Sequence, residues 1–304
     1  MTTRQEKNKE IQDAIIEEEL SKKRKLVVKR VVKIIFLVLL IFISFILYTK
    51  YIATEGLIFK ERRVINSRIP DSFDGAKIIH FSDLDYGTTI FLDEVKSMVK
   101  KINLRNPDLI LFSGDLIDSS YTISNEESEK LIIELSKLNA NIDKYAVLGD
   151  EDTDSSSTIL KQCGFNILDN EYDLVYSKDN NPILITGIST SKSRDINKAF
   201  SYFGVDTNNK QIYSVLLMHE VDDIDEVKSS YNVDLALAGG NMNGQIYIPG
   251  IGGLIKKEGF KKYYDEYYKL DNTELYISSG VGTDGFQFRF LRRPSINFFR
   301  ISKN

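Results

Sequence analysis

The chain has 304 residues, enough for one large domain or two small ones. A composition of 42% hydrophobic and 28% charged residues is that of a globular protein and excludes a disordered or fibrous one. The formal net charge of −4 gives no electrostatic reason to expect nucleic acid as a partner. The single cysteine, Cys163, excludes a disulfide within the chain.

The first recognisable element is an uncharged apolar run from Ile34 to Tyr48. Counted outward over 31–52, it reaches about 20 residues, the length that the core of a bilayer requires. Lys33 and Lys50 lie near its ends, where long side chains reach the membrane interface. A buried core helix would show a polar face, and this run shows none. A cleaved signal peptide would show a small-residue cleavage pattern after the run, and none follows it. Residues 31–52 are therefore predicted to form one transmembrane helix.

Basic residues crowd the N-terminal flank of this run between Lys22 and Lys33, whereas those on the other flank are fewer and more distant. The positive-inside rule keeps the more basic flank in the cytoplasm. We therefore expect residues 1–30 to form a cytoplasmic segment that is partly helical. The C-terminal bulk is then extracellular, held at the cell membrane by a single pass.

Beyond the run, residues 53–74 read as a linker, and short apolar stretches then alternate with amphipathic ones. Apolar residues between Val95 and Ile102 recur with the spacing of a helix, which predicts a helix there. Ser124 and Glu127 form a capping box, which predicts the start of a second helix. Alternation of this kind predicts an α/β domain over 75–304. The predicted strands are Lys77–Phe81, Leu109–Phe112, Tyr145–Leu148, Ile183–Thr186, Tyr213–Met218, Leu235–Ala238, Leu275–Ser278 and Ile296–Ile301.

Acidic residues, glycines and a histidine follow five of these strands, within 82–85, 113–115, 149–152, 219–220 and 239–241. Open α/β sheets bind their ligands at the carboxyl ends of strands. In this order the groups resemble the motifs of the calcineurin-like metallophosphoesterases, which read D-x-H, G-D, G-N-H-[DE], a later H, and G-H-x-H.

The resemblance runs from about Lys77 to the C-terminus, and 279–282 with Arg289 looks like the end of the family's membrane-anchored bacterial branch. It implies a sandwich of two β-sheets flanked by helices. It also implies hydrolysis of phosphoesters or pyrophosphates at two divalent metal ions.

Carried over by position, three residues match metal ligands of the family. Asp83 matches the first aspartate, Asp115 the carboxylate that bridges both ions, and His219 the lone histidine. Asp85 stands where the family has histidine and Asp150 where it has asparagine. We expect all five residues to lie at the metal site.

Other positions depart from the family. Glu151 replaces the histidine that contacts phosphate. An ungapped alignment puts Gly240 and Met242 at the two histidines of the last motif, whereas a one-residue shift would put Asn241 and Asn243 there. We prefer the ungapped alignment because the residues that follow then align too. With two histidines in the whole chain, a histidine-rich dinuclear site is excluded.

Such a carboxylate-rich set suits Mg²⁺, Mn²⁺ or Ca²⁺ better than Zn²⁺. We expect one retained ion rather than two, with the loss of both as the alternative. An ionised Glu151 at ~4 Å from a phosphoryl oxygen would repel it by ~4 kcal/mol at an effective dielectric constant of ~20. Two hypotheses follow: an impaired or altered hydrolase acting on a phosphorylated small molecule or lipid-linked substrate, and a catalytically inactive surface binding or scaffolding module.

Overall fold

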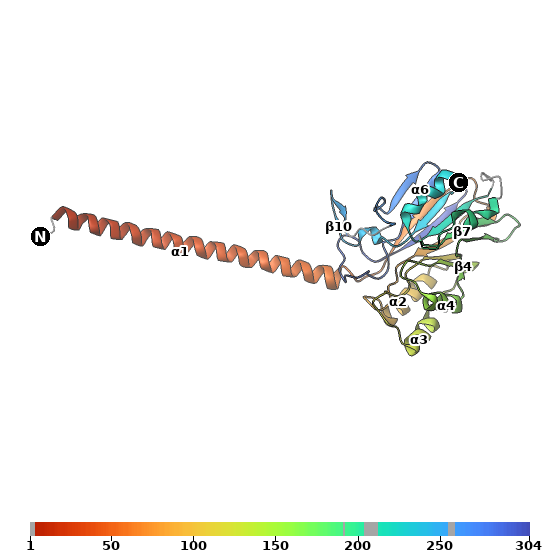
Figure 1. Ribbon diagram of the computed structural model, residues 1–304, viewed down its shortest axis with the longest axis horizontal. Coiled ribbons are helices and arrows are strands. Elements are labelled where there is room, and N and C mark those ends of the chain that lie inside the picture. Colours follow the sequence, from red (N-terminus) through yellow and green to blue (C-terminus); the bar gives the residue numbers. More distant parts are fainter. Residues whose placement is uncertain (1–3, 191, 204–211, 255–258) are drawn as a thin grey trace. The chain divides into compact units, whose positions relative to one another are not determined.

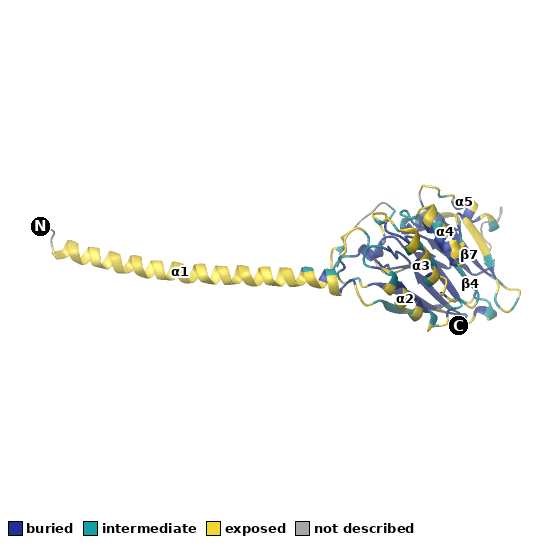
Figure 2. Ribbon diagram, turned by 90° about the horizontal axis from the view of Figure 1, so that it is seen from below, coloured by how far each residue is buried: buried dark blue, intermediate teal, exposed yellow. Residues whose placement is uncertain are grey.

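The computed structural model describes residues 4–190, 192–203, 212–254 and 259–304, and the chain divides into two units, Met1–Thr49 and Lys50–Asn304. The first unit is helix α1 (Arg4–Leu47), which a π-helical turn (Tyr48–Ile52) follows. No residue of α1 is buried, and its apolar part is long enough to cross a membrane (Figure 2). A helical segment that is apolar on every side fits lipid as its solvent.

One six-stranded sheet lies in the second unit, with the strand order β1-β14-β2-β3-β4-β5. Helices α2, α3 and α4 lie on the side of strand β4 that faces away from β7 (Figure 1). The strands from β2 to β5 are parallel to one another, whereas β14 is antiparallel to β2 and parallel to β1. The bounds are β1 Ile58–Ile65, β2 Lys77–Phe81, β3 Leu109–Ser113, β4 Asp143–Val147, β5 Asn166–Ile167 and β14 Ser295–Ser302.

A second six-stranded sheet has the order β12-β13-β9-β8-β7-β6, with a parallel centre and antiparallel edges. Its strands are β6 Glu171–Val175, β7 Ile183–Ile188, β8 Ser214–Met218, β9 Leu235–Ala238, β12 Tyr267–Leu270 and β13 Thr273–Ile277. A two-stranded ribbon, β10 (Tyr247–Ile248) and β11 (Gly252–Gly253), lies in the loop between β9 and β12.

The two sheets pack face to face, and helices cover their outer faces. Alternate residues of β2 show why: Ile79 and Phe81 pack toward α2, α3 and α4, whereas Ile78 packs toward the second sheet. A third apolar cluster joins the second sheet to α5 and α6. The helices are α2 Leu92–Asn103, α3 Asn125–Leu135, α4 Asp154–Gln162, α5 Ile196–Ala199 and α6 Ile224–Ser230.

The structure confirms the predicted α/β sandwich, and each of the eight predicted strands overlaps an observed one. The capping box is also present, because Ser124 is the N-cap of α3 and exchanges hydrogen bonds with Glu127. One expectation needs correction. Residues 53–74 are not simply a linker, because β1 pairs with β14 along its whole length and Phe73 is fully buried. The charged residues of β1 concealed it, since an edge strand buries little of its surface.

Two neighbouring residues of β1 test this correction. Val64 is 2% exposed and Ile65 is 52% exposed. We expect Val64→Asp to lower the free energy of unfolding by roughly 2–4 kcal/mol, because it places an unpaired carboxylate in the core. Ile65→Asp is the matched control and should change stability little. Thermal unfolding of the full chain in detergent measures both, and equal stability of the two variants would contradict the assignment of β1 to the core.

Candidate metal centre

The candidate residues all follow strands at one edge of the sandwich. Asp83 and Asp85 come after β2, and Asp115 comes after β3. Asp150 follows β4, and His219 comes directly after β8 of the other sheet. The carboxyl ends of β2, β3 and β4 meet at one edge because these strands are parallel. Facing sheets bring the end of β8 to the same place.

The backbone at three of these residues is in the left-handed region, with φ of 49° at Asp83, 44° at Asp85 and 60° at Asp115. Such conformations cost about 1–3 kcal/mol for a side chain other than glycine and cluster at functional sites. The two loops brace each other, because the carbonyl of Asp115 accepts hydrogen bonds from Leu84 and Asp85. These turns direct three carboxylates into one buried space.

His219 completes the cluster. One ligand atom from each of Asp83, Asp115 and His219 lies within 4.8 Å of the others, and all three residues are buried. His219 Nε2 lies 3.2 Å from Asp115 Oδ2 and 3.0 Å from Asp150 Oδ1. Its Nδ1 donates to the carbonyl of Ser113 at 2.7 Å, so Nε2 is the nitrogen turned to the carboxylates. A histidine fixed in this way is typical of metal ligands.

Asp85 provides the test of whether the residues fit an ion. Neither of its carboxylate oxygens has a hydrogen-bond partner in the described part of the chain, and the residue is 0% exposed. Burial and the charges of Asp83 and Asp115 raise the pKa of Asp85 well above its usual value. Burial likewise raises the pKa of Asp83 to about 7. Carboxylates this close need a cation or must stay protonated, so the set fits a divalent ion with oxygen ligands.

Gly240 and Met242 are the residues that the ungapped alignment puts at the two histidines of the last motif. The N–H of Gly240 donates to both carboxylate oxygens of Asp83, at 3.0 and 3.2 Å. A Cβ at Gly240 would lie 2.8 Å from His219 Nε2. The sulfur of Met242 accepts a hydrogen bond from Arg289 at 3.6 Å. Both residues therefore line the site without supplying a histidine nitrogen.

The alternative alignment is not supported by the side chains of Asn241 and Asn243. Asn241 Nδ2 donates to the carbonyl of Tyr263. Asn243 Oδ1 accepts a hydrogen bond from Ser279 at 2.5 Å. Asn241 Nδ2 and Asn243 Oδ1 thus bond to neighbouring loops, whereas Asn243 Nδ2 is buried without a hydrogen-bond partner among the described residues.

Glu151 and Asp152 have different roles from each other. Glu151 is half-buried; its N–H donates to Asp115 Oδ1 at 3.1 Å, and its carboxylate accepts from the N–H of Ser119 at 2.9 Å. The carboxylate of Asp152, which is also half-buried, accepts from three backbone N–H groups in the loops after β3 and β4. Asp152 therefore fixes the loops, whereas Glu151 stands at the rim of the cluster.

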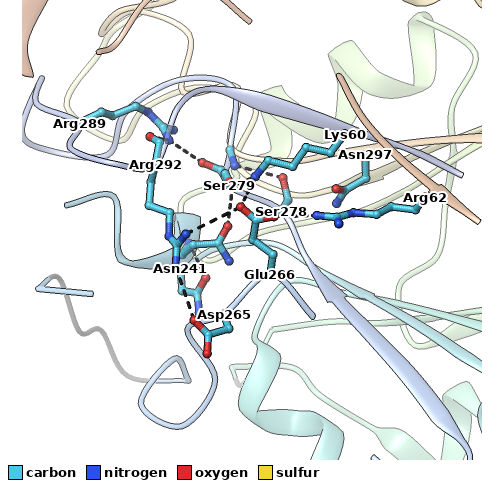
Figure 3. A network of polar contacts seen from close by, with 12 residues as sticks. Lys60, Arg62, Asn241, Asp265, Glu266, Ser278, Ser279, Arg289, Arg292 and Asn297 are labelled. Carbon is cyan, nitrogen blue, oxygen red and sulfur yellow. Dashed lines mark hydrogen bonds and ion pairs between the residues drawn. The ribbon is translucent and has the colours of Figure 1, made fainter. Parts of the chain in front are cut away.

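Sequence reasoning missed the place of Arg289, whose guanidinium is 0% exposed. It donates to the carbonyl of Ser279 (Figure 3) and to that of Gly282, and the negative charges of Asp85 and Asp83 favour its charged form. Burial lowers its pKa to about 10, so it stays a cation. A lone arginine in a loop gives no sequence pattern that would reveal its electrostatic interaction with Asp83 and Asp85, which lie far away in the sequence.

A group of ion pairs ties β1 to the same loops, with Glu266 between two bases (Figure 3). Lys60 Nζ lies 2.6 Å from Glu266 Oε1 and donates to Ser279 at 2.7 Å. Arg62 lies 2.7 Å from the other oxygen of Glu266. The segment expected as a linker therefore helps to position the loop that carries Gly280. This loop lies close to the site, because a Cβ added at Gly280 would lie 3.1 Å from Asp83 Cβ.

The domain is a sandwich of two mixed β-sheets, and its carboxylates and histidine lie together at the carboxyl ends of the strands. This is the arrangement expected of a metallophosphoesterase fold. The chain belongs to the calcineurin-like phosphoesterase family, whose profile matches residues 76–241. It is 30% identical over 261 residues to YkuE of Bacillus subtilis, named an uncharacterized metallophosphoesterase, covering 84% of this chain and 88% of that one.

More distant relatives include a transmembrane protein with metallophosphoesterase domain from Danio rerio. It is 23% identical, and the match covers 75% of this chain and 54% of that protein. Among solved structures, the calcineurin-like phosphoesterase YfkN of Bacillus subtilis matches with a TM-score of 0.39 and 13% identity, over 67% of this chain and 81% of that one.

Asp85 also yields a prediction about stability. Without a cation, Asp85 must either ionise beside Asp83 and Asp115 or take up a proton against its usual pKa, and both cost stability at neutral pH. Asp85→Asn removes this cost, so it should raise the melting temperature of the metal-free protein. The same change removes a ligand, so added Mn²⁺ should raise the melting temperature of the variant less than that of the wild type. Asp118→Asn is the control, since Asp118 is buried nearby but hydrogen-bonded to Ser120. A variant that behaves like the wild type with and without Mn²⁺ would contradict the ligand role of Asp85.

Proposed function

We propose that the protein is a membrane-anchored, metal-dependent phosphoesterase with an altered ligand set that holds one hard divalent ion. The observation that carries this proposal is the buried group of Asp83, Asp115 and His219, with the histidine fixed on the carbonyl of Ser113. Asp85 puts an oxygen donor where the family has a histidine nitrogen, and Asp150 puts a carboxylate oxygen where the family has an amide oxygen. This exchange favours Mg²⁺, Mn²⁺ or Ca²⁺ over Zn²⁺.

A divalent ion, when bound, supplies Lewis-acid polarisation of a phosphoryl oxygen. The chain's own residues supply the rest. His219 is held in one orientation by its Nδ1 hydrogen bond, so it presents Nε2 without reorganisation. Arg289 adds a buried positive charge that offsets the carboxylates. Glu151 works against catalysis, because its carboxylate stands where the family donates a hydrogen bond to phosphate.

A second candidate, the inactive binding module, draws support from the substitutions themselves. Glu151 repels an anionic substrate, and Gly240 and Met242 offer no nitrogen ligand for a second ion. Under this candidate the cluster binds an ion for structural reasons, and the domain acts as a surface scaffold.

Hydrolysis assays distinguish the two candidates. The full chain is tested on phosphomonoester and phosphodiester substrates with Mg²⁺, Mn²⁺ and Ca²⁺. We expect slow hydrolysis that Asp115→Asn abolishes and Asp118→Asn preserves. Folded wild-type protein that is inactive with every ion would favour the binding module.

Glu151→His restores the residue of the family and tests the electrostatic penalty separately. Removing ~4 kcal/mol of repulsion should raise the rate by up to ~10³-fold. The measurement is the rate at saturating metal for Glu151→His beside Glu151→Gln, which removes the charge without adding a ring nitrogen. A rate unchanged by both substitutions would show that Glu151 does not face the substrate.

The membrane orientation is a further part of the proposal. The basic flank of the apolar run supports a cytoplasmic N-terminus and an extracellular domain. Protease added to intact cells should digest a tag at the C-terminus and spare a tag at the N-terminus. The reverse pattern would contradict this orientation.

A further inference from the structure

Two loops at the metal-site edge carry large apolar side chains that face solvent. Ile251 (70% exposed) and Leu254 (49%) lie at the β10–β11 ribbon. Phe286 (69%) and Leu291 (52%) lie in the loop between β13 and β14. Exposed apolar residues that gather in one place mark an interaction surface rather than ordinary surface composition.

The two loops form one surface, because hydrogen bonds join them. Tyr247 donates to the carbonyl of Phe290 at 3.0 Å, and Phe290 donates back to Gln245 at 3.2 Å. The side chain of Gln245 also donates to the carbonyl of Phe286 at 2.6 Å. We call 245–254 and 284–292 together the apolar loop pair. The apolar loop pair adjoins the metal site. Met242, which comes shortly before the first loop, and Arg289, which belongs to the second loop, both lie near the carboxylate cluster.

The chain enters the domain at the same edge. Strand β14 is antiparallel to β2, and β1 is parallel to β14, so β1 begins beside the end of β2. Ile58 donates to the carbonyl of Pro294 at 3.0 Å, and Arg293 donates to the carbonyl of Gly56 at 3.3 Å. The first strand therefore starts next to the loop that carries Phe286 and Leu291.

The chain between the apolar span and β1 is short. Residues 53–57 separate Ile52 from Ile58. Even fully extended, this segment reaches about 20 Å. A membrane that holds residues 31–52 is therefore present at high effective concentration near the metal-site edge.

We propose that the apolar loop pair docks on the bilayer that holds the transmembrane helix, so that the metal site faces the lipid headgroups. Ile251, Leu254, Phe286 and Leu291 enter the interface, and the exposed Arg293 favours anionic headgroups. The substrate class is then a phosphoester borne by a lipid rather than one free in solution. This statement about substrate rests on the proposed phosphoesterase activity, whereas the docking does not.

The absence of tryptophan from the sequence makes a site-specific test available. Ile251→Trp is introduced into the full chain, which is reconstituted in lipid nanodiscs with plain or brominated acyl chains. We expect blue-shifted emission in plain discs and its loss in brominated ones. Leu104→Trp is the matched control, because Leu104 is 75% exposed but lies before β3, at the opposite edge of the sandwich. Leu291→Trp repeats the test on the second loop.

Quenching at positions 251 and 291 but not at 104 supports the docking. Emission that is equal in the two kinds of disc at both loop positions overturns it, and so does equal quenching at position 104. The fluorescence needs neither metal nor hydrolysis, so an inactive protein leaves this result intact and counts only against the phosphoesterase. For an active protein, faster hydrolysis of a vesicle-borne phosphoester than of its soluble headgroup analogue supports the substrate class, and equal rates overturn it.

Discussion

Mutual repulsion among buried carboxylates is the constraint on which the site depends. Asp83, Asp85 and Asp115 are withdrawn from solvent by the sheets that carry them, and water cannot stabilise their charges. The loops that hold them leave no room to relax: Gly114 has φ of 92°, and a Cβ there would lie 2.6 Å from His219 Nδ1. The fold therefore imposes a concentration of negative charge that a bound cation resolves.

The departures from the family change residue types at the site, while Asp83, Asp115 and His219 remain grouped. Aspartate at position 85 exchanges a nitrogen donor for oxygen, and glycine at position 240 leaves a backbone N–H on Asp83 where a histidine would ligate. Arg289 places a fixed positive charge near the same carboxylates. Oxygen donors of this kind suit hard ions. In the proposed function, Glu151 opposes the binding of phosphate. The chain belongs to the calcineurin-like phosphoesterase family whatever the outcome for Glu151.

Local sequence patterns predicted the core strands and the residues at their ends, because runs of β-branched residues and the short motifs that follow them each lie within a few consecutive residues. Eight strands and the grouping of Asp83, Asp115 and His219 were predictable in this way. Strand β1 was not, because its charged residues pair with Glu266 far along the chain and an edge strand lacks an apolar run. Arg289 was noticed only as part of the family resemblance. Its electrostatic interaction with Asp83 and Asp85 was not predictable, because the residues are brought near one another only by the fold.

Elemental analysis of the full chain, purified without chelator from medium containing Mg²⁺, Mn²⁺ and Ca²⁺, shows whether the carboxylate cluster holds a metal. We expect about one hard divalent ion per chain, lost when Asp115 is replaced by asparagine. A folded wild-type chain that retains no ion, even after incubation with each of the three at millimolar concentration, would contradict this expectation.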